Sequence, residues 1–488
     1  MKKISYLLSL VLTGVLVSCQ YDFPEIPSET PEPGEADFSK LITVGSSITS
    51  GIMDGALYDR GQQHSFSVIL AEQLKEVGGG DFNVPEINSE VGFFAPGPGG
   101  IPLGRLILRI NPNTGQVAPS PIVPGEPLQA YAGDRSAINN FGVNALTLGA
   151  ALIPETGDPS QSQHPAFNPH YARFARNPGS STVIGDAAAA LADQGTFFTF
   201  WLGKFDILAY AVTGGANPAL LTSDGDFTQR YNLALGSLLQ ANPEAKGAVA
   251  NIPNLNAIPY FTTVPWNAFP LTAAQANMAN SAYQDYNGGI AQAYSMGAIS
   301  EEEKDLRTIF FEAGQNGFVM EDETLTDLRE MGLPSIRQSH ANDRATLTLS
   351  TVLGQSVEGN PSAIRGLTVP ITDEFVLIPS EQQEVQAKIT TFNNVINSAV
   401  QANNERLVLV DVNEFFEQVR EGIINAGGVP LTASLAPPNG AFSVDGVHPN
   451  ARANAFLANY FIEAINQKWS SSIPKVNPNA YMGNDLPR

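Results

Sequence analysis

The chain has 488 residues, with 26 Lys or Arg against 48 Asp or Glu and a net charge of −22. Binding to a phosphate backbone needs clustered basic residues, so this charge balance argues against nucleic acid as a partner. Hydrophobic residues make up 43% of the chain and charged residues 15%, and there are 44 Gly and 35 Pro. This composition predicts a folded chain with a large core and long irregular loops.

Residues 1–18 have the layout of a secretory signal peptide, because Lys2 and Lys3 precede an apolar segment that is too short to span a bilayer. The sequence "LVSC", which ends at Cys19, resembles a bacterial lipobox, in which the Cys thiol is acylated and becomes the mature N-terminus. A free thiol in a discarded signal peptide is the alternative. Cys19 is the only Cys, so the chain cannot form an internal disulfide or a Cys-ligated metal site.

Residues 19–39 are rich in Pro and acidic residues and show no apolar periodicity, which predicts an extended tether behind the lipidated Cys. Gln20 follows the Cys, whereas lipoproteins of diderm bacteria that stay in the inner membrane usually have Asp there. The resemblance therefore implies an outer-membrane lipoprotein, attached to the membrane through its lipid anchor. The sequence leaves open whether the protein lies on the periplasmic or on the surface face of that membrane.

Four apolar runs predict buried strands, at residues 41–45, 196–203, 245–252 and 406–412. The runs are continuous and not alternating, as is typical of parallel strands that are covered on both faces. Helical spacing of apolar residues lies between these runs and near the C-terminus, at 227–239 and 457–465. We therefore expect an α/β sheet wound on both sides, with its functional groups at the carboxyl ends of the strands.

The α/β domain is expected to span residues 40–470, followed by a C-terminal tail at 471–488. Two regions exceed a minimal domain and look like insertions that shape a site, near 85–135 and 255–375. The first contains "FFAPGPGGIPLG" and "APSPIVPGEP", whose Pro and Gly content predicts neither strand nor helix.

Ser47 is placed as a nucleophile would be, since the strand at 41–45 runs directly into Gly45-Ser46-Ser47-Ile48. A residue on a Gly-opened turn just past the end of a strand projects into the ligand crevice. Ser residues at strand ends are also common as turn formers or helix caps. The position of Ser47 therefore indicates a nucleophile only if the chain also supplies a base.

His448 lies in "FSVDGVHPNARANAF", where Asp445 precedes it by three residues, in a loop that enters the last amphipathic helix. An Asp at this spacing can bond the far side of the imidazole, fix its tautomer and stabilise the imidazolium. A surface loop capped by Asp is the alternative. His164 and His170 lie six residues apart in a Pro-rich loop, which is no metal-binding spacing, and no metal or cofactor is expected.

"VGSSITSG" near the mature N-terminus and "DGVHPN" near the C-terminus resemble the first and last sequence blocks of the SGNH, or GDSL-type, serine hydrolases. The flanking sequence looks like the lipoprotein branch of that family. The resemblance implies a flavodoxin-like three-layer α/β/α sandwich with a parallel sheet. It also implies that Ser47 is the nucleophile, His448 the general base and Asp445 its orienting residue. Ser46 stands where the family usually has Asp or Asn.

The two middle blocks depart from the family. "NFGVNAL" resembles the second block, with Ala145 in place of the Gly whose N–H joins that of Ser47 in the oxyanion hole. "WLGKFDILAYA" resembles the third block, Gly-x-Asn-Asp, with Phe205 in place of the oxyanion-binding Asn. Loss of one such donor typically costs a hundredfold to a thousandfold in rate. Lys204 and Asn144 are the nearest replacement donors in sequence.

The resemblance therefore implies an extracytoplasmic serine esterase or lipase, possessing a depleted oxyanion hole, that acts on an acyl lipid or an acylated glycan. The alternative is a catalytically impaired lipoprotein that keeps the fold and serves as a binding or assembly subunit for an outer-membrane protein. Phe205 and Ala145 favour the alternative, and the intact Ser, His and Asp favour the enzyme.

Overall fold

The computed structural model describes residues 30–110, 117–424 and 430–488. The signal peptide and Cys19 lie outside these residues. The described residues from Glu32 to Arg488 belong to one compact unit. The part of the chain that is described has no helix both long and apolar enough to cross a membrane.

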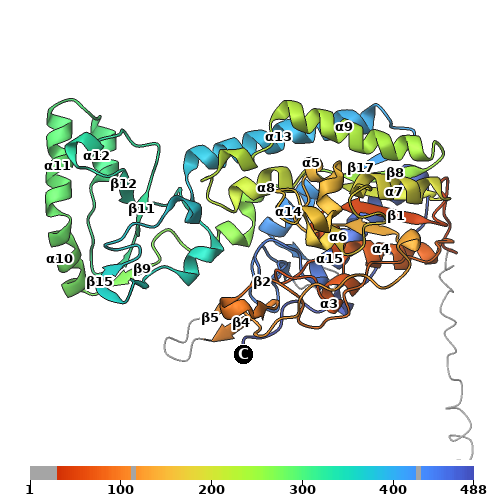
Figure 1. Ribbon diagram of the computed structural model, residues 1–488, viewed down its shortest axis with the longest axis horizontal. Coiled ribbons are helices and arrows are strands. Elements are labelled where there is room, and N and C mark those ends of the chain that lie inside the picture. The colour runs from red at the N-terminus through yellow and green to blue at the C-terminus, as the bar shows by residue number, and fades with distance from the viewer. Residues whose placement is uncertain (1–29, 111–116, 425–429) are drawn as a thin grey trace, which may run out of the picture. The chain divides into compact units, whose positions relative to one another are not determined.

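The compact unit is built on a five-stranded parallel sheet, in the order β17-β8-β7-β1-β6 (Figure 1). Numbered along the chain, these strands read 2-1-3-4-5 across the sheet. The strands are β1 (Leu41–Gly45), β6 (Asn140–Gly142), β7 (Phe197–Trp201), β8 (Lys246–Ala250) and β17 (Leu407–Val410). The four predicted strands are confirmed, each within a few residues, and β6 is a fifth.

Helices cover both faces of the sheet, as two neighbouring residues of β7 show. The Phe200 ring contacts Tyr231 of α9 (Asp224–Ala241), whereas the Trp201 ring contacts Phe66 of α4 (Phe66–Lys75) and Phe461 of α15 (Ala451–Trp469). Because successive side chains of a strand point to opposite faces, α9 lies on one face and α4 and α15 on the other. The mixed α/β class is confirmed, and the arrangement is compatible with three layers.

The helices are α2 (Ser47–Ser50), α3 (Asp59–Gln63), α4 (Phe66–Lys75), α5 (Leu148–Ala151), α6 (Pro169–Ala172), α7 (Val183–Ala192), α8 (Phe205–Ala211), α9 (Asp224–Ala241), α10 (Ala273–Ala282), α11 (Gln284–Ser295), α12 (Glu301–Arg307), α13 (Pro379–Gln401), α14 (Val412–Glu421) and α15 (Ala451–Trp469). The predicted helical patterns fall within α9 and α15. Their apolar stripes, with Phe227 and Phe461 fully buried, pack into the main core.

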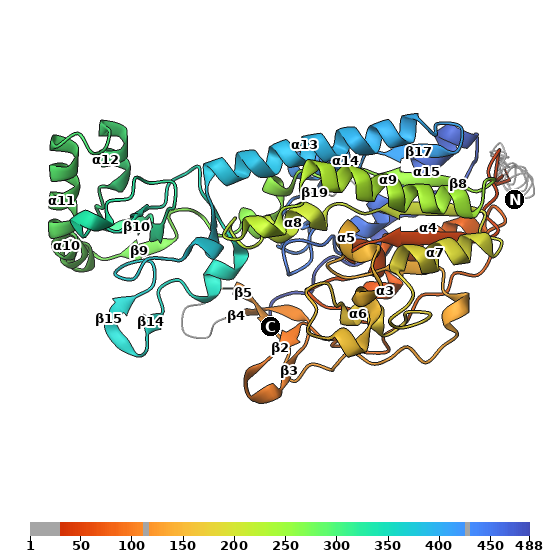
Figure 2. The same cartoon turned by 45° about the horizontal axis from the view of Figure 1, so that its top comes forward.

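The first insertion forms two hairpins, which lie close together in Figures 1 and 2. Their strands are β2 (Ala95–Pro96) with β3 (Pro102–Leu103), and β4 (Leu106–Ile110) with β5 (Val117–Pro121). The expectation that "APSP" cannot join a strand was wrong. Pro is tolerated there because β5 pairs only with β4 and is an edge strand.

The second insertion has a hydrophobic core of its own, which includes Phe269, Phe318 and Val376. Its elements lie together beside the start of α13 in Figures 1 and 2. Besides α10–α12, it contains the short strands β9 (Phe269–Leu271), β10 (Gly314–Asn316), β11 (Val319–Glu321), β12 (Ile336–Gln338), β13 (Arg344–Ala345), β14 (Ser356–Val357), β15 (Asn360–Ile364) and β16 (Val376–Leu377). A last small pair is formed by β18 (Ile423–Ile424) and β19 (Pro430–Leu431).

Two segments predicted to lie outside the domain are packed against it. Phe38, at the end of the predicted tether, is 2% exposed and packs in the main core. In the predicted C-terminal tail, Ile473 is 2% exposed and Arg488 exchanges backbone hydrogen bonds with β4. Scattered apolar residues in these polar segments supply the contacts, although they show no periodicity.

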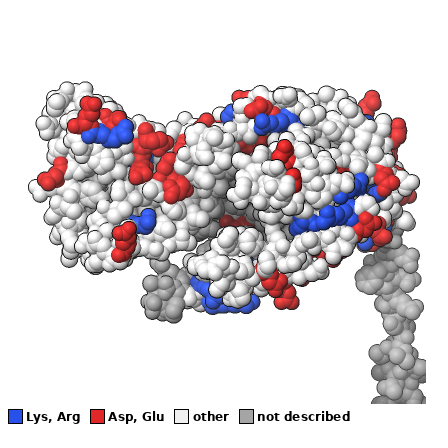
Figure 3. All heavy atoms as spheres, viewed as in Figure 1, with Lys and Arg blue, Asp and Glu red and all other residues white. Residues whose placement is uncertain are grey.

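Most of the face in Figure 3 is uncharged, in line with the low charge content.

Candidate active site

The Ser47 turn follows β1 directly, and α2 begins at Ser47. Gly45 is required at the end of the strand, because a Cβ there would lie 2.0 Å from Thr49 Oγ1. Ser47 is 2% exposed, and neither its hydroxyl nor its backbone N–H donates to any residue that the structure describes. The turn therefore presents a hydroxyl and an N–H that are both uncommitted.

Asp445 and His448 form the predicted pair, with 2.9 Å between Asp445 Oδ2 and His448 Nδ1. Asp445 Oδ1 accepts from the backbone N–H groups of Val447 and His448. Burial alone would raise the pKa of the Asp445 carboxyl, but attraction to His448 and these hydrogen bonds outweigh it and lower the pKa to about 2. An ionised carboxylate can only accept, so His448 carries its proton on Nδ1 and leaves Nε2 free to act as a base.

Asp54 connects the segment after Ser47 to the His448 loop, a role that the sequence analysis missed. Its N–H donates to Ser443 Oγ over 3.0 Å, and its Oδ1 accepts from the N–H of Val444 over 3.0 Å. The N–H of Gly55 donates to Asp445 Oδ2 over 2.6 Å. These three bonds join loops that lie almost 400 residues apart in sequence.

Ser47 and the Asp445–His448 loop lie at the same edge of the sheet. Gly45 of β1 pairs with Trp201 of β7, so the residues that follow both strands emerge side by side at the carboxyl edge. Lys204, just past β7, is attracted by the charge of Asp445. The Ser47 hydroxyl forms no hydrogen bond with His448. A distance of about 4 Å or less between Ser47 Oγ and a ring nitrogen of His448 stays a prediction.

Ala145 has φ +54°, in the left-handed region that Gly adopts most readily. This conformation is unfavourable for Ala by about 1 kcal/mol. The N–H of Ala145 donates to no residue within the described ranges, while the next N–H, of Leu146, bonds Ser46 Oγ over 3.2 Å. A backbone donor is therefore available at the position that the resemblance assigns to the oxyanion hole.

Phe205, at the start of α8, is half-buried and lines a cavity of about 770 Å³ together with Ala145. The cavity wall is mostly apolar, with Leu152, Phe167 and Leu220. A Phe ring cannot supply the amide that the resemblance implies at this position.

Asn144, one of the two sequence-based replacement donors, already has a partner: its Nδ2 lies 3.4 Å from His170 Nε2. Burial lowers the pKa of His170 to about 4, so this His is neutral at pH 7 and accepts the bond. His170 was expected to be a loop residue and lies instead in the short helix α6, on the wall of the same cavity.

Asp206 is the acidic residue of the segment that resembles the third block. Its side chain is fully buried and holds the fold together through hydrogen bonds. Its carboxylate accepts from the N–H of Leu148 over 2.9 Å and from Thr222 Oγ1 over 3.0 Å. Burial raises the pKa of Asp206 to about 6, although both bonds oppose the change. The residue holds the start of α5 beside the oxyanion segment.

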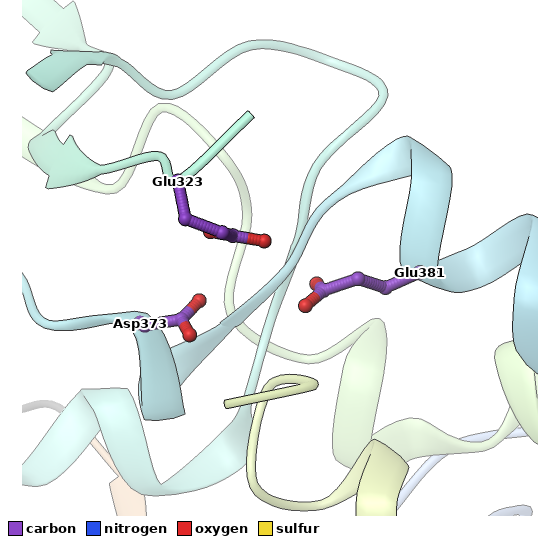
Figure 4. Close-up of side chains that lie close together, drawn as sticks. All are labelled: Glu323, Asp373 and Glu381. Carbon is purple, nitrogen blue, oxygen red and sulfur yellow. The ribbon is translucent and has the colours of Figure 1, made fainter. Parts of the chain in front are cut away.

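A second polar cluster lies where the second insertion meets α13. The carboxylates of Glu323, Asp373 and Glu381 point toward one another in Figure 4, with one oxygen of each within 4.8 Å of the others. Carboxylates at this separation could hold one hard cation. Only Glu381 is buried, and exposed acidic groups are common without an ion. The cluster is formed by different residues from those of the Ser47 site.

Comparisons with models of protein families, with curated proteins and with solved structures give no match to this chain.

Proposed function

We propose that the chain is a serine ester hydrolase of the SGNH type, in which Ser47 attacks, His448 moves the proton and Asp445 orients His448. The observation that carries the proposal is the 2.9 Å contact between Asp445 and His448, at the edge of the sheet where β1 leads into Ser47. The 2-1-3-4-5 strand order is that of flavodoxin-like sheets, which bind ligands between the first and third strands. Ser47 follows the first of these strands.

The reaction would be an acyl transfer in two halves. Ser47 Oγ adds to the ester carbonyl carbon as its proton passes to His448 Nε2, and the alcohol leaves with that proton. Water then repeats the sequence and releases the acid. The N–H groups of Ser47 and Ala145 are uncommitted and suit the oxyanion that forms in each half.

We also propose that the enzyme is attached to the outer membrane through acylated Cys19, and that its substrate is an acyl lipid or an acylated glycan. A binding or assembly subunit that retains the fold is the second candidate. It is favoured by Phe205, whose apolar side chain stands where the resemblance implies an amide donor.

The test is labelling by a fluorophosphonate probe, together with hydrolysis of a short p-nitrophenyl ester. We expect the wild-type chain to be labelled on Ser47 and to hydrolyse the ester, and Ser47→Ala to lose both. Ser237→Ala, on α9 outside the site, is the matched control. A folded wild type whose ester hydrolysis equals that of Ser47→Ala would exclude the enzyme and leave the binding subunit.

A further inference from the structure

The cavity that Ala145 and Phe205 line together (the Ala145 cavity) has a mostly apolar wall that the rest of the fold leaves partly uncovered. Its larger apolar side chains are Leu152, Ile153, Phe167, Phe205 and Leu220. All of them are half-buried except Leu220, which is 38% exposed. An apolar concavity of about 300 to 1,000 Å³ is the usual form of a small-molecule site. The Ala145 cavity, of about 770 Å³, falls within that range.

The polar side chains in the wall of the Ala145 cavity already bond within the protein. They are Asn144, Thr147, Asn168, His170, Thr222 and Arg230. The charge of Arg230 is paired with Asp226 over 3.5 Å, and the unpartnered Nδ1 of His170 is buried beneath the surface. A sugar would lose water from several hydroxyl groups here and find few free partners, whereas an aliphatic chain has no such cost. The wall therefore favours an aliphatic group.

Two hydrogen bonds hold the wall of the Ala145 cavity against the Ser47 turn. The N–H of Leu146 donates to Ser46 Oγ over 3.2 Å, and the N–H of Val143 donates to the carbonyl oxygen of Gly45 over 3.1 Å. Their donors flank Ala145, and their acceptors are the two residues that directly precede Ser47. The cavity therefore lies beside the segments that carry the two proposed oxyanion donors.

The segments that line the cavity decide which half of the ester it can hold. Within the described chain they lie at residues 144–153, 165–170, 205–209 and 219–230, and the His448 loop is not among them. In the proposed reaction the alcohol oxygen takes its proton from His448 Nε2, so the alcohol half faces that loop. The acyl half is bonded to the other side of the carbonyl carbon and extends away from His448. The Ala145 cavity is therefore placed for the acyl half.

We propose that the Ala145 cavity binds the acyl chain, and that the substrate is an ester of a medium-length aliphatic acid. The inference rests on the proposed hydrolase function, and it selects an acyl lipid over an acylated glycan. It also gives a role to Phe205, which stands where the resemblance implies an amide. Phe205 lies one helical turn before Ala209 on α8, and both line the cavity, so this face of the helix contacts the acyl chain.

The first experiment varies the acyl chain and then the side of the ester that carries it. We expect kcat/KM for p-nitrophenyl octanoate to exceed that for the acetate by about a hundredfold, because each methylene group that leaves water contributes up to about fourfold. Ethyl octanoate and octyl acetate are isomers that carry an eight-carbon chain on opposite sides of the ester. Titration of the released acid should give ethyl octanoate at least a tenfold higher kcat/KM.

The second experiment changes the wall of the cavity. Leu220→Asp places a charge beside the acyl chain, and we expect the ratio of kcat/KM for octanoate over acetate to fall at least tenfold. Leu233→Asp is the matched control, because Leu233 is 56% exposed on α9 and does not line the cavity. It should keep the ratio within twofold. If Leu220→Asp fails to fold, Ala219→Trp, which fills the cavity from an exposed position, should lower the ratio in the same way.

The outcomes separate the acyl site from the hydrolase. A wild type that is labelled at Ser47 but hydrolyses acetate and octanoate equally overturns the acyl site and leaves the hydrolase intact. So does a preference for octyl acetate over ethyl octanoate, a higher kcat/KM for glucose pentaacetate than for ethyl octanoate, or a folded cavity variant that keeps the wild-type ratio. A wild type that is neither labelled nor turns over any ester overturns both.

Discussion

Replacement of Glu381 by Gln should make the chain more stable at alkaline pH and leave its stability unchanged in acid. Glu381 is 6% exposed at the start of α13 and faces Glu323 and Asp373. Burial raises the pKa of Glu381 to about 8, and repulsion from these carboxylates adds to the increase, although the hydrogen bond from the Ile378 N–H opposes it. The folded chain therefore keeps a proton that the unfolded chain releases near pH 4.5.

Because the folded state binds more protons, the free energy of unfolding falls as the pH rises from about 4.5 to about 8. Full linkage between these values corresponds to about 5 kcal/mol. A cavity of about 500 Å³, lined by Glu323 and Asp373, admits solvent that screens the repulsion. We therefore expect an effect of about 2 kcal/mol. Gln keeps an acceptor for the Ile378 N–H and is neutral throughout.

The assay is thermal unfolding at pH 5, 7 and 9 in buffer that contains a chelator, so that divalent cations do not mask the repulsion. Glu405→Gln, an exposed change on the loop before β17, is the control. At pH 9 we expect Glu381→Gln to melt about 2 °C above wild type, and at pH 5 to melt with it. The reasoning is refuted if wild-type stability does not fall between pH 5 and 9, or if Glu381→Gln is the less stable chain at pH 9.

Three further predictions concern the site and its anchor. Ala145→Gly should keep both stability and esterase activity, because relief of the left-handed strain at φ +54° offsets the greater entropy of Gly in the unfolded chain, whereas Ala145→Val should lower the melting temperature. Asp206→Ala should reduce the free energy of unfolding in urea by about 2 kcal/mol or more, since Leu148 N–H and Thr222 Oγ1 lose a buried acceptor; an unchanged midpoint would contradict this role. Mass spectrometry of the protein from its native membrane should find a lipid-modified Cys19 at the N-terminus, and an unmodified start elsewhere would remove the anchor.

The sequence predicts those parts of the fold whose signal is local. The strands β1, β7, β8 and β17 are continuous apolar runs, and Asp445 and His448 are three residues apart, so each can be recognised within a short window. The strand β6 has only three residues, among them a polar Asn and a Gly, and no periodicity marks it. The packing of residues 32–39 and of the C-terminal tail depends on single apolar side chains whose partners lie at the opposite end of the chain.

The residues of the candidate site could likewise be predicted only where their signal lies within a short stretch of sequence. Asp54 belongs to an "MDG" that indicates only a turn, because its partners Ser443 and Val444 lie almost 400 residues away. The resemblance implied the loss of a donor at Phe205, and the sequence alone could not distinguish Lys204 from Asn144 as its replacement. In the structure the Asn144 side chain is hydrogen-bonded to His170, and the Lys204 side chain makes no hydrogen bond or ion pair within the described chain, so the replacement donor stays a prediction.

The bonds of Asp54 and Gly55 to the His448 loop also show how the chain accommodates its long insertions. Direct hydrogen bonds join the segment after Ser47 to the His448 loop, and the second insertion adds one more, from the N–H of Tyr260 to the carbonyl oxygen of Gly446 over 3.0 Å. The entropic cost of closing a loop rises only slowly with its length, by about 0.6 kcal/mol for each doubling. The second insertion offsets its own ordering cost through a separate hydrophobic core. Beyond the contact at Tyr260, the insertion can therefore change in sequence and length at little cost to the alignment of the candidate triad, while a change at Asp54 acts on that alignment directly.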